Sequence, residues 1–156
     1  MKIQFSPHMV LMRWLFPFFV TLLMMLLLDA AWLSLTAQLV YRAQLGDILI
    51  PGFRIAPAAA FYLLQALGIQ IFAVSRARGF GDALLYGAGF GLFTYATYDL
   101  TNWATLKDWT LGLSLADISW GILLTALAAT AGYAASRRVA RMAGSGKRAK
   151  RRSAFS

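Results

Sequence analysis

The sequence predicts an all-α integral membrane protein, a bundle of four transmembrane helices with both termini in the cytoplasm. Of its 156 residues, 60% are hydrophobic and only 13% are charged, and the mean hydropathy is +0.62. Its apolar runs are longer than a small soluble core would use, and its basic residues concentrate outside them. We expect a basic N-terminus at residues 1–13, one membrane domain at 14–135, and a basic tail at 136–156 that is disordered or a fraying helix.

The first two predicted spans each have a proline near their beginning. Pro17 falls in the first turn of the first span and Pro57 at the start of the second, where a missing N–H costs nothing. The first span exceeds a signal-peptide core and no clear cleavage site follows it, so we expect it to stay attached. Polar connections separate the remaining spans. In order, the spans are expected at residues 14–36, 56–75, 83–103 and 111–135.

The distribution of basic residues predicts the orientation. Four crossings place both ends of the chain and the connection at 76–82 on one side of the membrane. Eight basic residues lie at 137–152, and four more share that side, whereas the opposite loops hold three, partly offset by two aspartates. The positive-inside rule therefore predicts a multi-pass membrane protein with both ends of the chain in the cytoplasm. The residues outside the tail are Lys2, Arg13, Arg76 and Arg78 on the inner side, and Arg42, Arg54, Lys107, Asp47 and Asp108 on the outer side.

Three aspartates, Asp29, Asp99 and Asp117, lie inside predicted spans that contain no lysine or arginine. A carboxylate in hydrocarbon costs about 2.5–3.5 kcal/mol on insertion scales, so each must be neutralised, hydrated or paired. Each aspartate lies one to two turns from the outer end of its span. The three side chains are therefore expected to meet near the outer leaflet, and any function is expected there.

One face of the third span changes from small to polar residues. At 100° per residue, Gly87, Gly91, Tyr95, Tyr98 and Asn102 lie within about 40° of one line, with Asp99 about 80° away, and Ala83 extends the stripe by one turn. The small residues have the spacing that lets helices approach closely, so we expect helix packing there. The polar residues are candidates for a ligand or ion site. The small residues are Ala83, Gly87 and Gly91, and the polar ones Tyr95, Tyr98 and Asn102.

Each aspartate has a tryptophan three or four residues after it: Trp32, Trp103 and Trp120. Amphipathic indole rings anchor membrane helices at the interface, and that is the general expectation for these three. Their spacing also allows them to flank the aspartate site. Gln65 and Gln70 are polar positions within the second span, where hydrogen bonding between helices is the expected role.

The composition excludes several kinds of chemistry. Without cysteine there is no disulfide, thiolate metal site or cysteine nucleophile, and the single histidine, His8, precedes the first span. We expect no metal site and no cofactor. The net charge of +9 belongs mainly to the tail, which is expected to contact anionic lipid headgroups. Nucleic-acid binding is not expected, because the tail offers one aromatic residue, Phe155, and no stacking platform.

Several segments carry a family resemblance. They are FGLFTYATYDLTNWATL at 90–106, DISWGILLT at 117–125, LLLDAAWLSL at 26–35, YRAQLGDIL at 41–49 and AAAFYLLQALGI at 58–69. With them the chain resembles a bacterial family of predicted membrane proteins, domain of unknown function 2177, from about residue 20 to 135. The resemblance implies an inner-membrane protein of four helices and carries over no activity, ligand or catalytic residue.

Three functions remain open from the sequence. The aspartates could bind or translocate a proton, cation or small polar ligand, with oxygens of Tyr95, Tyr98 and Asn102 completing the shell. A homodimer would then complete the wall that four short spans leave thin. Alternatively, neutral carboxylic acids could act as hydrogen-bond glue between helices in a structural or partner-binding protein. The third hypothesis, a lipid-modifying enzyme with an aspartate as general acid or base, lacks a recognised nucleophile, and the chain is expected not to be an enzyme.

Overall fold

Four long helices and one π-helical turn make up the described part of the chain. The computed structural model describes residues 7–36, 50, 52 and 54–153, and the side chains of 11–36, 50, 52 and 54–144. No strand occurs among these residues, which confirms the all-α fold class for them. In chain order, the elements are α1 (Pro7–Thr36), α3 (Ile55–Ile69), η3 (Gln70–Val74), α4 (Phe80–Thr105) and α5 (Leu111–Ser153).

Three helical segments are long and apolar enough to cross a membrane: Leu11–Thr36, Ile55–Val74 and Leu111–Gly144. α4 has 26 residues but is not counted with them. The segment TYATYDLTN in its second half has polar side chains on most turns, and these lower the mean hydropathy of the helix. The structure therefore supports three of the four predicted spans by length and hydropathy.

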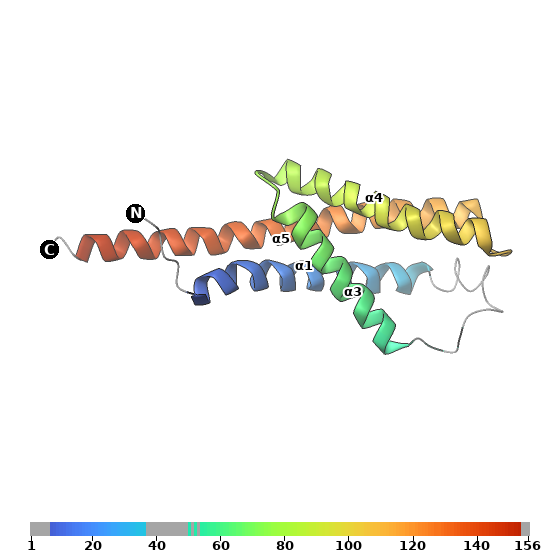
Figure 1. The fold of residues 1–156 in the computed structure, drawn as a ribbon, viewed down its shortest axis with the longest axis horizontal. Helices are drawn as coiled ribbons and strands as arrows, with labels where there is room; N and C mark the ends of the chain where they lie inside the picture. The colour runs from blue at the N-terminus through green and yellow to red at the C-terminus, as the bar shows by residue number, and fades with distance from the viewer. Residues whose placement is uncertain (1–6, 37–49, 51, 53, 154–156) are drawn as a thin grey trace.

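α5 is the central helix of the arrangement. It runs antiparallel to α4 along one side and to α1 along another, and these two pairs have the most extensive contacts (Figure 1). α3 crosses the others obliquely. The start of α1, the α3–α4 connection and the end of α5 lie toward the same end of the molecule (Figure 1).

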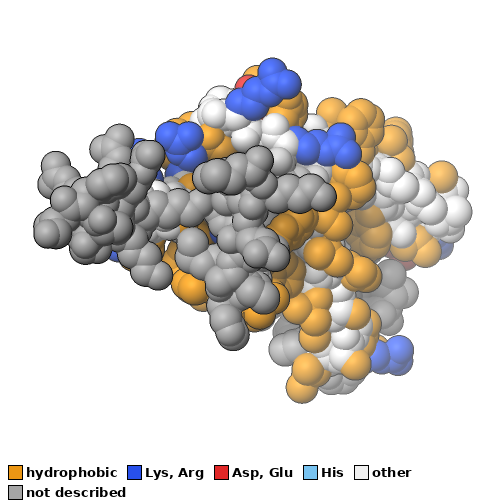
Figure 2. Space-filling model, turned by 60° about the vertical axis from the view of Figure 1, so that its left-hand side comes forward, with side chains coloured by type: hydrophobic (Ala, Val, Ile, Leu, Met, Phe, Trp, Pro, Cys, Tyr) orange, Lys and Arg blue, Asp and Glu red, His pale blue; other side chains and the backbone are white. Residues whose placement is uncertain are grey.

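Most large apolar side chains are exposed, whereas the interior holds small and polar side chains together with a few large apolar ones. The core combines Met25, Ile69 and Leu124 with alanines of α3 and α5. Leucines and phenylalanines point outward on every helix, and hydrophobic side chains dominate the face drawn in Figure 2. Such a surface suits contact with lipid tails, and the polar residues then face the interior.

The contact between α4 and α5 depends on glycine. A Cβ atom on Gly87 would lie 2.6 Å from the carbonyl oxygen of Thr125, and one on Gly91 would collide with the Thr125 hydroxyl and the Gly121 carbonyl. Gly121 in turn accommodates the ring of Tyr95. Ala83, which continues the stripe, is fully buried. The two backbones therefore approach more closely than larger residues would allow.

Both ends of the membrane domain differ from the sequence expectation. α1 begins at Pro7, so Pro17 lies inside the helix, and its assignment to a first turn was wrong. The residues before it, MVLMRWLF, contain no helix stop, which explains the longer helix. α5 continues as a helix to Ser153, through the tail that we expected to be disordered or fraying. Alanine and basic residues, which favour helix, dominate that segment in spite of two glycines.

The close α4–α5 approach predicts a difference between two neighbouring glycines. Gly91→Ala should destabilise the chain by about 1–3 kcal/mol, because the new methyl group meets backbone that cannot move aside. Gly89→Ala is the matched control, since nothing lies within 4 Å of a Cβ atom there. It should leave stability unchanged or raise it by up to about 1 kcal/mol. Unfolding of the purified chain in detergent measures both variants, and equal stabilities would contradict this packing.

Candidate functional site

Asp29 is held by residues of two other helices. It is 7% exposed, and its Oδ1 accepts a hydrogen bond of 2.8 Å from the Trp120 indole N–H of α5. The Tyr62 hydroxyl of α3 lies within hydrogen-bonding reach of the same carboxyl. Asp29 therefore connects α1, α3 and α5.

Trp32 and Trp120 pack against each other between α1 and α5. Their rings are stacked at a centroid distance of 4.7 Å and an interplanar angle of 6°. Both side chains are partly buried, and the Trp32 indole nitrogen is buried without a hydrogen-bond partner among the described residues. The stack covers the Asp29 site, so these two tryptophans flank an aspartate. Trp103 is 45% exposed, as an interfacial anchor would be.

Asp99 is fully buried where α4 nears its end. Its side chain is 0% exposed, and neither carboxyl oxygen has a hydrogen-bond partner of normal geometry in the described part of the chain. Asp117 and Trp109 lie within hydrogen-bonding reach of this carboxyl group, and Asp117 also interacts with it electrostatically. A buried polar group without a partner is expensive, so Asp99 is the least satisfied side chain of the site.

The connection between α4 and α5 packs against Asp99 through Trp109. The Trp109 indole N–H donates a 3.0 Å hydrogen bond to Ser114 Oγ, which donates a 3.5 Å bond to the backbone carbonyl of Asp99. Trp109 is 6% exposed and meets the Tyr98 ring edge-on at 5.7 Å. These contacts fix the end of α4 against the start of α5.

Asp117 lies between the other two acids. It is half-buried in α5 and interacts electrostatically with both Asp29 and Asp99. It also lines a cavity of about 530 Å³ between α3, α4 and α5. In that cavity, Gln65 Nε2 donates a 3.1 Å hydrogen bond to Thr94 Oγ1. The described lining consists of Phe61, Gln65, Thr94, Tyr95, Tyr98 and Asp117.

The three polar candidates on α4 differ in their position relative to this cavity. Tyr95 and Tyr98 line it, and Tyr98 is 57% exposed and hydrogen-bonded to Asn102. The structure thus brings the three aspartates and two tyrosines together, with Asn102 attached through Tyr98. Within the described residues, no group of three or more His, Cys, Asp or Glu side chains could hold a metal ion.

Sequence reasoning missed several members of the site: Thr94, Phe61, Tyr62 and Trp109. Thr94 and Tyr62 are polar residues inside apolar helices, so the rule that selected Gln65 could also have selected them. Trp109 lies outside every predicted span, in a connection whose fold hydropathy does not predict.

Comparison with known proteins gives one match. The model of the family described as predicted membrane protein (DUF2177) matches residues 14–134, which is most of the chain. No curated protein and no solved structure matches it. The family match confirms the resemblance found in the sequence motifs and assigns no activity. The chain is a member of the DUF2177 family of predicted membrane proteins.

Proposed function

We propose that this protein crosses the membrane four times and binds a proton, or a small cation that replaces it, between Asp99 and Asp117. One observation carries the proposal. Asp117 lines the cavity and interacts with Asp99, whose buried carboxyl oxygens have no hydrogen-bond partner of normal geometry among the described residues. The cavity gives a ligand access to Asp117, which interacts with Asp99. The proposed role is therefore uptake, and in the simplest case transfer, of this small cation.

The fourth crossing is assigned to α4. Its 26 residues extend about 39 Å, more than the roughly 30 Å of a hydrocarbon core. It lies antiparallel to α5, an apolar span, for its whole length (Figure 1). An even number of crossings puts both ends of the chain on the side with most basic residues, the cytoplasmic side of an inner membrane.

The physical chemistry of the pair favours proton exchange. Two carboxylates near each other in a medium of low dielectric constant repel, and one shared proton removes the repulsion. Neither 83–103 nor 111–135 contains a lysine or arginine that could neutralise the pair. A proton or an external cation must do so. Tyr95 and Tyr98 line the same cavity and offer hydroxyl oxygens to an arriving ion.

Asparagine substitutions test this proposal, because asparagine preserves size and hydrogen bonding but does not titrate. In proteoliposomes with a pH-sensitive dye inside, Asp99→Asn and Asp117→Asn should each abolish pH-driven proton movement. The matched control is Asp108→Asn, which removes an exposed acid from the α4–α5 connection. It should behave as the wild type. Normal flux in both site variants, or no flux in the wild type, would contradict a proton-exchanging pair.

Asp29 supports a second, structural role. Its carboxyl already accepts the Trp120 N–H, so this acid acts as a hydrogen-bond link between helices. Proton exchange at Asp99 and Asp117 and a structural link at Asp29 are compatible within one molecule. Under this proposal, Asp29 is structural because it is hydrogen-bonded to Trp120, whereas Asp99 and Asp117 exchange protons.

The Asp29 link predicts the effect of removing its donor. Trp120→Phe keeps an aromatic ring beside Trp32 but leaves a buried carboxyl oxygen without its N–H, which should cost about 1–3 kcal/mol. Asp29→Asn keeps an acceptor oxygen and should cost much less. Trp103→Phe, at an exposed position, is the matched control. Unfolding in detergent compares the three, and a Trp120→Phe variant as stable as Trp103→Phe would remove the structural link.

A further inference from the structure

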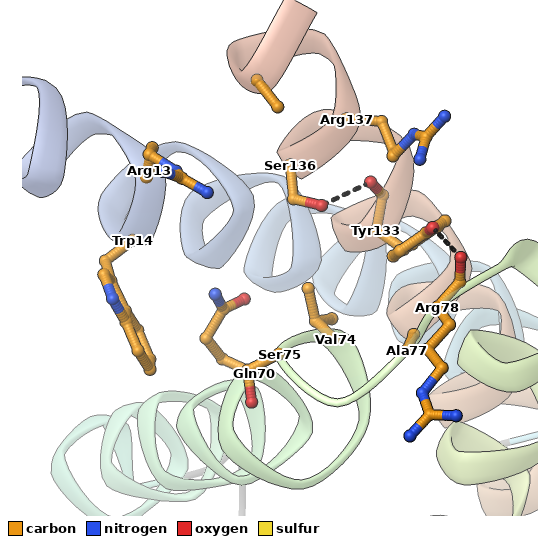
Figure 3. Close-up of a pocket in the computed structure, with 11 residues that line it drawn as sticks. Arg13, Trp14, Gln70, Val74, Ser75, Ala77, Arg78, Tyr133, Ser136 and Arg137 are labelled. Atoms are coloured by element: carbon orange, nitrogen blue, oxygen red, sulfur yellow. Dashed lines mark hydrogen bonds between the residues drawn. The ribbon is translucent and has the colours of Figure 1, made fainter. Parts of the chain in front are cut away.

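A second cavity, of about 490 Å³, lies at the other end of the molecule (Figure 3). It is bounded by α1, η3, the α3–α4 connection and α5. Three arginines from three of these segments line it: Arg13, Arg78 and Arg137. Among the described lining residues there is no carboxylate. Sixteen residues of α1 separate Arg13 from Asp29, about 24 Å along the helix, so this cavity is distinct from the aspartate site.

Gln70 is the unsatisfied polar group of this cavity. It is 4% exposed, and its Oε1 is buried without a hydrogen-bond partner in the described part of the chain. Figure 3 shows its amide pointing from η3 into the space between α1 and α5, toward Arg13 and Ser136. Gln70 is also the first residue of the π-helical turn, a distortion common at functional sites. A ligand that carries a hydrogen-bond donor would satisfy Gln70 Oε1.

Arg78 and Arg137 form the rim. Their backbones are held together, because the Tyr133 hydroxyl donates a 2.8 Å hydrogen bond to the Arg78 carbonyl and Ser136 Oγ donates one of 2.8 Å to the Tyr133 carbonyl. Their guanidinium groups are exposed and point outward in Figure 3. Long side chains at fixed positions can turn toward an anion at the mouth of the cavity. Guanidinium groups bind phosphate oxygens particularly well.

We propose that this cavity binds the headgroup of an anionic phospholipid, with the phosphate at the rim arginines and a headgroup hydroxyl donating to Gln70 Oε1. A phosphodiester group alone satisfies the arginines but has no hydroxyl to donate to Gln70, whereas a phosphoglycerol headgroup supplies both the phosphate and a hydroxyl. The proposal is independent of the aspartate site.

The surroundings favour a lipid over a soluble phosphate. Trp14 lines the cavity and is 49% exposed. Leu11, Met12 and Leu15, its neighbours on α1, are also exposed, and they offer an apolar surface along which acyl chains can lie. Tryptophan is typical of the level at which headgroups meet hydrocarbon. This end of the molecule also carries the arginines that the positive-inside rule assigns to the anionic inner leaflet.

Ligand titration distinguishes the sources of phosphate. The full chain is purified in detergent and its thermal unfolding is followed as short-chain phosphatidylglycerol is added. A saturable rise in melting temperature is expected, because a bound headgroup bridges η3, the α3–α4 connection and α5. Short-chain phosphatidylcholine, glycerol phosphate and inorganic phosphate should give little or no rise. An equal rise with either soluble phosphate would overturn the lipid assignment, and an equal rise with phosphatidylcholine would overturn headgroup recognition.

Two double variants of equal charge locate the site. Arg78→Gln with Arg137→Gln should weaken phosphatidylglycerol binding by about tenfold or more, since two charged contacts are lost. Arg76→Gln with Arg138→Gln is the matched control, because these arginines neighbour the rim residues in sequence but do not line the cavity. It should bind almost as the wild type does. Equal losses in both doubles would show diffuse attraction to basic charge and overturn the proposal.

Gln70→Leu tests the donor requirement. The substitution removes the buried amide at similar volume, and phosphatidylglycerol affinity should fall by about fivefold while the rim arginines remain. Undiminished binding in a folded Gln70→Leu variant would overturn the role of the amide oxygen. If this variant does not fold, the two arginine doubles still decide whether the cavity holds the headgroup.

Discussion

The close approach of α4 to α5 is the constraint on which the rest of the structure depends. Gly87 and Gly91 bring α4 against the backbone of α5 at Gly121 and Thr125. One turn further along, this approach places Tyr95 over Gly121, and it then buries Asp99 beside Asp117. Larger residues at the glycine positions would separate the helices and open the aspartate pair to lipid. The close contact between α4 and α5 therefore determines both the helix packing and the burial of the proposed proton site.

The polar groups of the interior divide into satisfied and unsatisfied sets. Asp29 has the Trp120 indole, and Gln65 has Thr94. Asp99 and Gln70 are buried with carboxyl or amide oxygens that lack partners in the described structure. Asp99 interacts with Asp117, which lines one cavity, and Gln70 lines the other. Thr21 Oγ1 and Trp32 Nε1 are also buried without partners among the described residues, but neither residue lines these two cavities. Because unpaired buried groups are costly, Asp99 and Gln70 support the two binding proposals.

The sequence predicted that the three acids approach one another but not the rotation of the helices that hold them. A fixed rise per residue predicted that Asp29, Asp99 and Asp117 lie near one another, and Asp117 interacts with both of the others. The glycine stripe also predicted which face of α4 packs closely. Yet Asp99, about 80° from that stripe by helical geometry, is fully buried, whereas Tyr98 on the stripe is 57% exposed. Trp109, from the connection, covers Asp99, and hydropathy carries no information on how such a connection folds. The Trp32–Trp120 stack and the π-helical turn at Gln70 likewise depend on contacts between distant segments.

We propose that Asp99 and Asp117 hold an exchangeable proton inside the membrane. Infrared difference spectroscopy of the chain in lipid, recorded across a pH titration, measures this most directly through the carbonyl stretch of a protonated carboxylic acid. A protonated-carboxyl band that changes with pH is expected in the wild type; it should persist in Asp29→Asn and be lost in Asp99→Asn. A spectrum with no such band, or a band unaffected by Asp99→Asn and Asp117→Asn, would contradict it.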